Sequence, residues 1–235
     1  MKSVLISIRP KWCELIANGE KTTEVRKTRP KLDVPFKCYI YCTKSTGSDS
    51  LWVLNEIGRS KFADKTSKIA DVFGAKDVGG CYKGNGKVIG EFVCDFLEMI
   101  TFQKIEEEEI EFEDDISECL TKDACLNIKE AFEYSHGKPL YGWHISNLVI
   151  YDKPKELGEF RIEDKAAIKM CEHRFRTGQP EDVVRNGGWL QGGFVCMKKS
   201  GEPEWCENCL SKPLTRPPQS WCYAEEQTTE RNEKA

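Results

Sequence analysis

The chain has 235 residues, of which 39% are hydrophobic and 31% charged, a composition that predicts a soluble globular protein with a sizeable core. No apolar run is long enough to cross a bilayer and no signal peptide follows Met1, so we expect a cytoplasmic protein that makes no use of a membrane. The net charge of −4 is uneven, because residues 1–44 hold ten Lys and Arg against four Asp and Glu, a balance of +6 that leaves −10 for residues 45–235. A basic first part on an acidic chain indicates a local site for a polyanion and argues against indiscriminate coating of nucleic acid.

A strand, a helix and a second strand are predicted at the start of the chain. β-Branched residues alternate over residues 4–8, as they do in a short strand. Pro10 begins a helical run and Gly19 follows its end, where a helix often terminates. Residues 22–26 have the composition of a second strand, with Thr23 and Val25 on one face.

Three ionisable side chains are expected to converge near the connection between this helix and the second strand. They are Lys21, Glu24 and Arg26. An ammonium, a carboxylate and a guanidinium at close range perturb one another's pKa values, which is typical of a functional site. The alternative interpretation is a surface cluster of salt bridges without a function.

This opening resembles an ASCH domain, a small PUA-like β-barrel. The run from Ser7 to Trp12 and a Gly-x-Lys-x-x-Glu-x-Arg core, formed by Gly19, Lys21, Glu24 and Arg26, carry the resemblance. Residues 139–148 and 216–223 are similar to later parts of phage and prophage ASCH proteins. Together these matches cover most of residues 1–160 and the C-terminal part, and they imply a phage or prophage origin.

The fold that follows is α+β, a PUA-like (ASCH) β-barrel with helical insertions. We expect the barrel in residues 1–160, with further strands over residues 35–42, 86–102 and 140–151. Insertions are expected at about residues 43–85 and 103–138. In the first, the pattern of Trp52, Leu54, Ile57 and Phe62 indicates a short helix that packs on the barrel.

The second insertion begins with an acidic run. Residues 106–115 hold eight Asp and Glu in ten positions, which predicts a solvated, mobile loop, the alternative being a metal-binding or DNA-mimicking role. A helix is predicted to follow, with Asn127 as its N-cap and Glu130 in the capping-box position. Residues 136–139, His-Gly-Lys-Pro, are expected to end it.

Cysteines gather in a predicted extension, residues 161–223, which precedes a charged tail expected to be disordered over residues 224–235. Nothing marks the chain as secreted, so the twelve cysteines indicate thiols or a metal site rather than disulfides. Cys206 and Cys209 have the Cys-x-x-Cys spacing that zinc favours. We expect a structural zinc ion held by four of five cysteines, with His173 as a less favoured candidate ligand. The alternative is free thiols or a redox pair. The five cysteines are Cys171, Cys196, Cys206, Cys209 and Cys222.

One functional hypothesis is a binding module for RNA or a nucleotide, as the resemblance implies. The phosphate would meet Arg or Lys, a base would stack on Trp12 and Glu24 would accept from an exocyclic amine. His144 is expected either to bind the ligand or to be an ordinary half-buried strand residue. The expected ligand-binding residues are Arg9, Trp12, Lys21, Thr23, Glu24, Arg26 and His144.

The other hypothesis is a small hydrolase, because some ASCH proteins are similar to N4-acetylcytidine amidohydrolases. Those enzymes use a Lys, a Thr and a Glu. Their lysine matches Lys21, but Glu24 stands at the position of their threonine. Their later glutamate has no secure counterpart in residues 106–125. If the protein is an enzyme, Lys21 and Glu24 are the expected catalytic residues. A phage counter-defence protein that sequesters a nucleotide is a further interpretation. In either hypothesis Lys21→Ala is expected to abolish activity while the fold stays intact.

Overall fold

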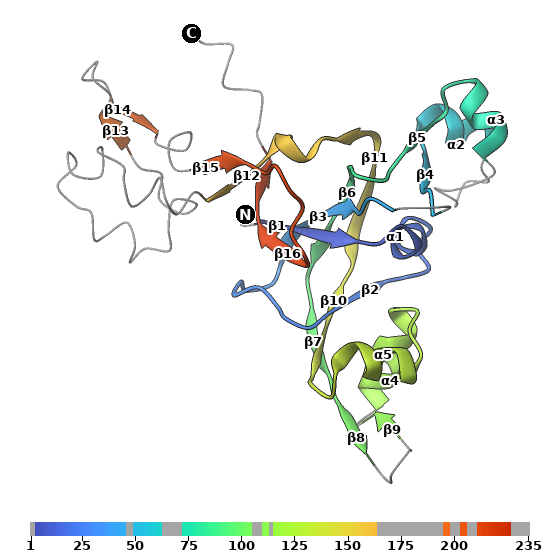
Figure 1. Cartoon of the computed structure of the whole chain (residues 1–235), viewed down its shortest axis with the longest axis vertical. Helices are drawn as coiled ribbons and strands as arrows, with labels where there is room; N and C mark the ends of the chain where they lie inside the picture. Colours follow the sequence, from blue (N-terminus) through green and yellow to red (C-terminus); the bar gives the residue numbers. More distant parts are fainter. Residues whose placement is uncertain are drawn as a thin grey trace.

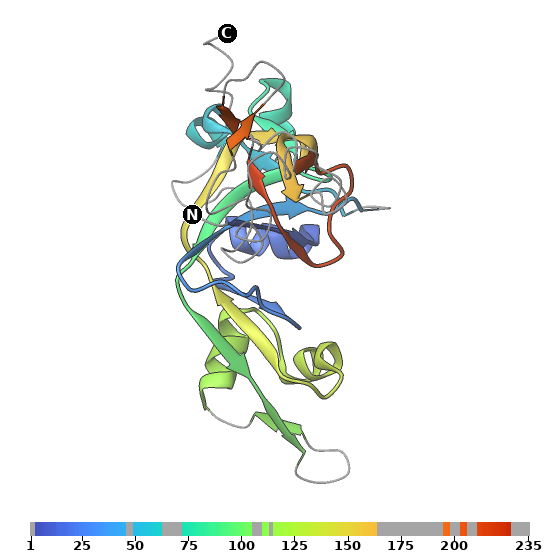
Figure 2. The same cartoon turned by 90° about the vertical axis from the view of Figure 1, so that its left-hand side faces the viewer.

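The structure is a computed structural model that describes residues 3–45, 49–62, 72–104, 110–112, 115–163, 195–197, 203–205 and 211–226. Its class is mixed α and β, with many strands and few helices. The described part is elongated, with a five-stranded sheet at one end and a small hairpin, β8–β9, at the other (Figures 1 and 2).

The five-stranded sheet has the order β11-β6-β3-β1-β16. Strand β1 (Ser3–Ile8) pairs in parallel with β3 (Phe36–Cys42) and antiparallel with β16 (Trp221–Tyr223). Strands β6 (Val88–Cys94) and β11 (Ser146–Lys155) complete it. The strands predicted near residues 4–8 and 35–42 are therefore present, and residues 221–223 pair with the first of them.

Two strands predicted as continuous are each divided between two sheets. The first divides at Asp95 and Phe96 into β6 and β7 (Leu97–Ile100), and the second at Ile145 into β10 (Leu140–His144) and β11. Strands β2 (Thr23–Arg26), β10 and β7 form a separate three-stranded sheet. Backbone groups at the breaks are hydrogen-bonded outside the strand ladders. The His144 amide donates to the Phe96 carbonyl at 3.1 Å, and the Ile145 amide donates to the Thr22 carbonyl at 2.8 Å.

A closed barrel is not found among the strand pairings of the described residues. The larger sheet ends at β11 and β16, and the three-stranded sheet ends at β2 and β7. The α+β character of the prediction is thus confirmed, whereas the strands that the structure describes form open sheets.

Helix α1 (Pro10–Ala17) covers the main core beside β1. Pro10 occupies the first turn, where its missing amide hydrogen costs nothing, and Gly19 has φ +78°, a conformation that favours glycine. Cys13 and Ile16 are fully buried against the sheet. Trp143 from β10 is also fully buried and meets Phe36 edge to face at 5.7 Å, so it is a core residue and not a stacking surface for a ligand.

The first predicted insertion contains a short hairpin and two helices. Strand β4 (Trp52–Leu54) pairs with β5 (Cys81–Lys83), and α2 (Glu56–Phe62) and α3 (Val72–Asp77) lie between them in the chain. The predicted helical face was wrong, because Trp52 and Leu54 are in a strand and Ile57 and Phe62 of α2 are exposed. Helix α2 packs instead through Gly58, where an added Cβ would stand 1.9 Å from the Gly80 carbonyl oxygen.

The second insertion carries β8 (Phe102–Lys104), β9 (Ile110–Phe112), α4 (Asp115–Asp123) and α5 (Ile128–Ser135). Part of the acidic run is a strand rather than a loop, since β9 pairs with β8; residues 105–109 and 113–114 lie outside the described part. The predicted capping box of α5 is confirmed, with Asn127 and Glu130 bonded reciprocally. The helix ends as predicted, at His136 with φ 54°.

The chain returns to the core after the predicted extension. Strand β12 (Phe160–Glu163), which follows the short 3₁₀ helix η1 (Leu157–Glu159), pairs with β15 (Ser211–Pro213) and β17 (Glu225–Glu226). Between them the structure describes only the paired strands β13 (Val195–Met197) and β14 (Pro203–Trp205). The first residues of the tail expected to be disordered are ordered, because Ala224 is buried and residues 225–226 are in β17; residues 227–235 lie outside the described part. None of the described helices has the length and apolarity needed to span a bilayer.

Candidate functional site

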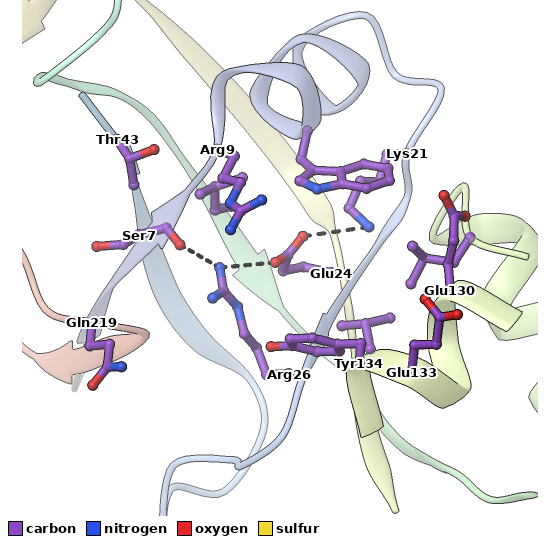
Figure 3. Close-up of a pocket in the computed structure, with 14 residues that line it drawn as sticks. Ser7, Arg9, Lys21, Glu24, Arg26, Thr43, Glu130, Glu133, Tyr134 and Gln219 are labelled. Carbon is purple, nitrogen blue, oxygen red and sulfur yellow. Dashed lines mark hydrogen bonds and ion pairs between the residues drawn. The ribbon is translucent and has the colours of Figure 1, made fainter. Parts of the chain in front are cut away.

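A cavity of about 540 Å³ lies beside the first strand-helix-strand segment. Its walls come from β1, the start of α1 and β2 on one side and from α5 on the other, and Gln219, before β16, also contributes (Figure 3). Five of the seven ligand-binding residues predicted from the sequence line it: Arg9, Trp12, Lys21, Glu24 and Arg26.

Lys21, Glu24 and Arg26 form one buried ionic cluster, hereafter the Lys21 cluster. Lys21 Nζ lies 3.5 Å from Glu24 Oε2, and Arg26 Nη2 lies 2.9 Å from Glu24 Oε1 (Figure 3). The three side chains are 3%, 8% and 9% exposed, respectively, so the prediction of convergence is met but the cluster is not a surface salt bridge. Both oxygens of Glu24 are therefore occupied by cations of the protein itself.

The cluster is tied to two other parts of the chain. Lys21 Nζ donates to the Ala124 carbonyl at 2.8 Å, just after α4, and Arg26 Nη2 donates to the Ser7 carbonyl at 2.7 Å in β1. Arg26 Nε is buried without a hydrogen-bond partner among the described residues. The cluster thus holds the two sheets and the second insertion together at the floor of the cavity.

Burial determines the protonation of Lys21. Removal from water lowers the pKa of its ammonium, and the neighbouring Glu24 carboxylate offsets only part of this effect. The effect of burial on the pKa of Lys21 is therefore larger than the opposing effect of Glu24. Lys21 therefore loses its proton more readily than an ordinary surface lysine.

Two aromatic side chains line the cavity. Trp12 is half-buried, with Lys21 Nζ 5.2 Å and Lys11 Nζ 4.6 Å from the centre of its ring system. Tyr134 on α5 is 38% exposed, and Lys27 Nζ lies 4.8 Å from its ring centre. Partly exposed aromatic faces in a cavity offer stacking surfaces for a planar ligand.

Arg9 is the cation of the cavity that no acidic side chain of the described residues neutralises. Its backbone carbonyl accepts from the amides of Trp12 and Cys13, which fixes it at the start of α1. Its side chain is exposed and is drawn near the centre of the close-up (Figure 3). An exposed guanidinium at a cavity is a fitting partner for phosphate or carboxylate.

The other two predicted ligand-binding residues lie elsewhere. Thr23 is 1% exposed and packs against Gly142 of the neighbouring strand. His144 Nδ1 lies 2.7 Å from Asp95 Oδ1, and both side chains are about half exposed. Neither residue lines the cavity. The hydrogen bond from His144 lowers the pKa of Asp95. The alternative interpretation of His144, an ordinary half-buried strand residue, describes its place better.

Sequence reasoning missed the wall formed by α5. Glu130, Glu133 and Tyr134 of α5 line the cavity together with Leu126, which lies just before the helix; they follow Leu126 by four, seven and eight residues. Such spacing places side chains on one face of a helix. The periodicity was available in the sequence, but nothing local indicates that this face meets residues more than a hundred positions earlier.

The zinc prediction remains a prediction. Cys171, Cys206, Cys209 and His173 lie outside the described residues, and Cys196 is described only through its strand. Cys222 is half-buried in β16 opposite Leu5, and burial raises the pKa of its thiol to about 11. The described residues contain no group of three side chains suited to a metal ion.

Comparison with known proteins returns no matching family model and no matching curated protein. Among solved structures, the ASCH protein of Zymomonas mobilis is similar, with a TM-score of 0.40 and 15% identity over 66% of this chain and 74% of that one. Two mutant forms of that protein give TM-scores of 0.39 and 0.34 at 14% and 15% identity, covering 67% and 65% of this chain and 77% and 70% of theirs. The phage or prophage origin that the sequence resemblance implies stays a prediction.

Proposed function

We propose that the cavity binds a nucleotide, either free or as one unit of a single-stranded RNA. The observation that carries the proposal is the combination, in one cavity of about 540 Å³, of the unneutralised Arg9 with two partly exposed aromatic rings, Trp12 and Tyr134. The volume lies within the range of small-molecule sites, roughly 300–1,000 Å³. A nucleotide has both of the groups that such a cavity would bind, a phosphate that can contact Arg9 and a planar base that can stack on the aromatic rings.

The proposed roles differ from those expected from the sequence. Arg9 binds phosphate through its exposed guanidinium, and the base stacks on Trp12 or Tyr134. Glu24 is poorly placed to receive an exocyclic amine, because its side chain is only 8% exposed and Lys21 and Arg26 already lie 3.5 and 2.9 Å from its two oxygens. The Lys21 cluster instead shapes and rigidifies the floor of the site.

Hydrolysis of an acylated nucleoside is a second candidate function, favoured by the lowered pKa of Lys21 beside the carboxylate of Glu24. A buried amine that deprotonates readily is suited to act as a base or a nucleophile. Incubation of the protein with an acylated cytidine, followed by chromatography, tests this candidate. Turnover that is lost in Lys21→Arg, which keeps a permanent charge at the same position, would establish it; unchanged nucleoside would exclude it for that substrate.

Calorimetric titration with nucleoside monophosphates and with the matching nucleosides tests the binding function. We expect the monophosphates to bind and the nucleosides to bind at least tenfold more weakly, since a charged hydrogen bond to Arg9 is lost. Arg9→Ala should weaken the monophosphate by a similar factor. Arg29→Ala is the matched control, because it removes an exposed arginine that does not line the cavity.

Two outcomes would overturn the proposal. One is the absence of binding for every nucleotide and for short single-stranded oligonucleotides. The other is an equal loss of affinity in Arg9→Ala and Arg29→Ala, which would show that general positive charge, and not the cavity, attracts the ligand.

A further inference from the structure

The carboxylates of the cavity are not equivalent. Three of them line it: Glu24 on β2, and Glu130 and Glu133 on α5. The α5 pair stands on the opposite side of the close-up from Ser7, Thr43 and Gln219 (Figure 3). The cavity therefore offers an acidic wall in addition to the arginine that meets phosphate.

Two of the three carboxylates already have partners within the protein and are therefore less suited to bind a ligand. Glu24 is held by Lys21 and Arg26 through both oxygens. Glu130 Oε2 accepts from the Asn127 amide at 3.2 Å as part of the capping box, so moving it would cost the helix its cap. Glu133 is exposed, and within the described part of the chain it has no side-chain hydrogen bond or ion pair.

Glu133 is also placed next to a stacking surface. It precedes Tyr134 in α5, and both side chains line the cavity. An ionised carboxylate can only accept hydrogen bonds, so it favours a donor at the edge of a stacked base and repels a carbonyl oxygen there. Cytosine and adenine present an exocyclic amine where uracil and hypoxanthine present a carbonyl.

We infer that Glu133 is a specificity-determining residue that accepts a hydrogen bond from the exocyclic amine of the bound base, so that the site selects amino bases over keto bases. The inference rests on the proposed nucleotide-binding function and names the ligand class of the same cavity. It moves the amine acceptor from Glu24, where the sequence motif suggested it, to a helix far along the chain.

Calorimetric titration of the full chain with two pairs of nucleotides tests the inference. The pairs are cytidine and uridine monophosphate, and adenosine and inosine monophosphate, which differ at the amine or carbonyl position. We expect the amino member of each pair to bind about tenfold more tightly, the effect of one hydrogen bond to a charged group. In Glu133→Gln the preference should fall below about twofold, because an amide can donate to a carbonyl as well as accept from an amine.

Glu14→Gln is the matched control, since it neutralises an exposed glutamate of α1 outside the cavity and should keep the tenfold preference. Far-ultraviolet circular dichroism checks that α5 is intact in Glu133→Gln. Equal binding of the amino and keto members by the unmodified protein, or an unchanged preference in Glu133→Gln, would overturn the inference and leave the proposed function standing. Failure of all four nucleotides to bind would overturn the inference, and it would overturn the proposed function only if every other nucleotide and short single-stranded oligonucleotides also failed to bind.

Discussion

Two charged clusters of this protein differ chiefly in how much water reaches them. In the Lys21 cluster the charged side chains are 3–9% exposed. In the second, hereafter the Glu91 cluster, Lys37 lies 2.8 Å from Glu91 Oε1 and the Tyr151 hydroxyl donates to Glu91 Oε2 at 2.6 Å. There Lys37 and Glu91 are 35% and 21% exposed.

The clusters respond to their surroundings in different ways. In the first, burial dominates and lowers the pKa of Lys21 despite its carboxylate partner. In the second, burial would raise the pKa of Glu91, but the hydrogen bonds from Lys37 and Tyr151 outweigh it and leave the pKa lowered. A buried charge depends on each of its partners, whereas a partly hydrated one has water as a substitute.

The largest effect is expected in the Lys21 cluster. Lys21→Met keeps the bulk of the side chain but removes the bond to the Ala124 carbonyl and one partner of Glu24. We expect a loss of about 3 kcal/mol in the free energy of unfolding, measured by urea titration, because a buried pair is broken from one side. The expectation that Lys21→Ala leaves the fold intact stays a prediction, and the expected loss of stability makes Arg9 the better residue for testing binding.

Lys11→Met is the control for that measurement, since Lys11 is exposed on α1 and contacts only the Trp12 ring among its recorded interactions in the described residues. It should change stability by less than about 0.5 kcal/mol. If Lys21→Met proved as stable as the unmodified protein, the contacts of Lys21 would contribute no net stability to the fold. A direct chemical role would then be the better explanation for a lysine at this position.

A smaller effect is expected in the Glu91 cluster. Glu91→Gln removes the charge but keeps a hydrogen-bonding group between Lys37 and Tyr151. The expected loss in the free energy of unfolding is about 1 kcal/mol at neutral pH, again by urea titration. A loss as large as that of Lys21→Met would contradict the view that hydration separates the two clusters.

Acid should remove the difference in stability between the unmodified protein and Glu91→Gln. The folded-state pKa of Glu91 lies below its ordinary value of 4.5, so its carboxylate stabilises the fold above about pH 4.5 and this contribution is lost as the pH falls through the folded-state pKa. Thermal denaturation between pH 7 and pH 3 should show the two proteins converging at the acid end. A constant difference across that range would refute the lowered pKa.

The smallest effect is expected at the pair of His144 and Asp95, whose side chains are 45% and 46% exposed. Asp95→Asn should cost less than about 0.5 kcal/mol, because both partners are well hydrated. Thermal denaturation measures it. A loss above 1 kcal/mol would show that the break between the two sheets at Asp95 and Phe96 depends on this contact.

Short-range features of the fold were predictable from the sequence, and long-range ones were not. The capping box of Asn127 and Glu130 and the left-handed Gly19 follow from neighbours within a few residues. The hydrogen bond from Lys21 to Ala124 spans 103 residues and depends on where the second insertion meets the first strand-helix-strand segment. Strand periodicity also could not show that the strands over residues 86–102 and 140–151 divide between sheets, because each keeps its alternation on both sides of the break.

The pairing of β16 with β1 also has a consequence for synthesis on the ribosome. Ser7 donates its hydroxyl to the Pro218 carbonyl at 2.7 Å and its amide to the Ser220 carbonyl at 2.9 Å, and Gln219 lines the cavity between them. At a synthesis rate of about 5–20 residues per second, β16 emerges from the ribosome roughly 10–40 s after β1. Until then β1 has an open edge beside an incomplete cavity, so a nascent chain is exposed to strand pairing with its neighbours before it acquires a ligand site.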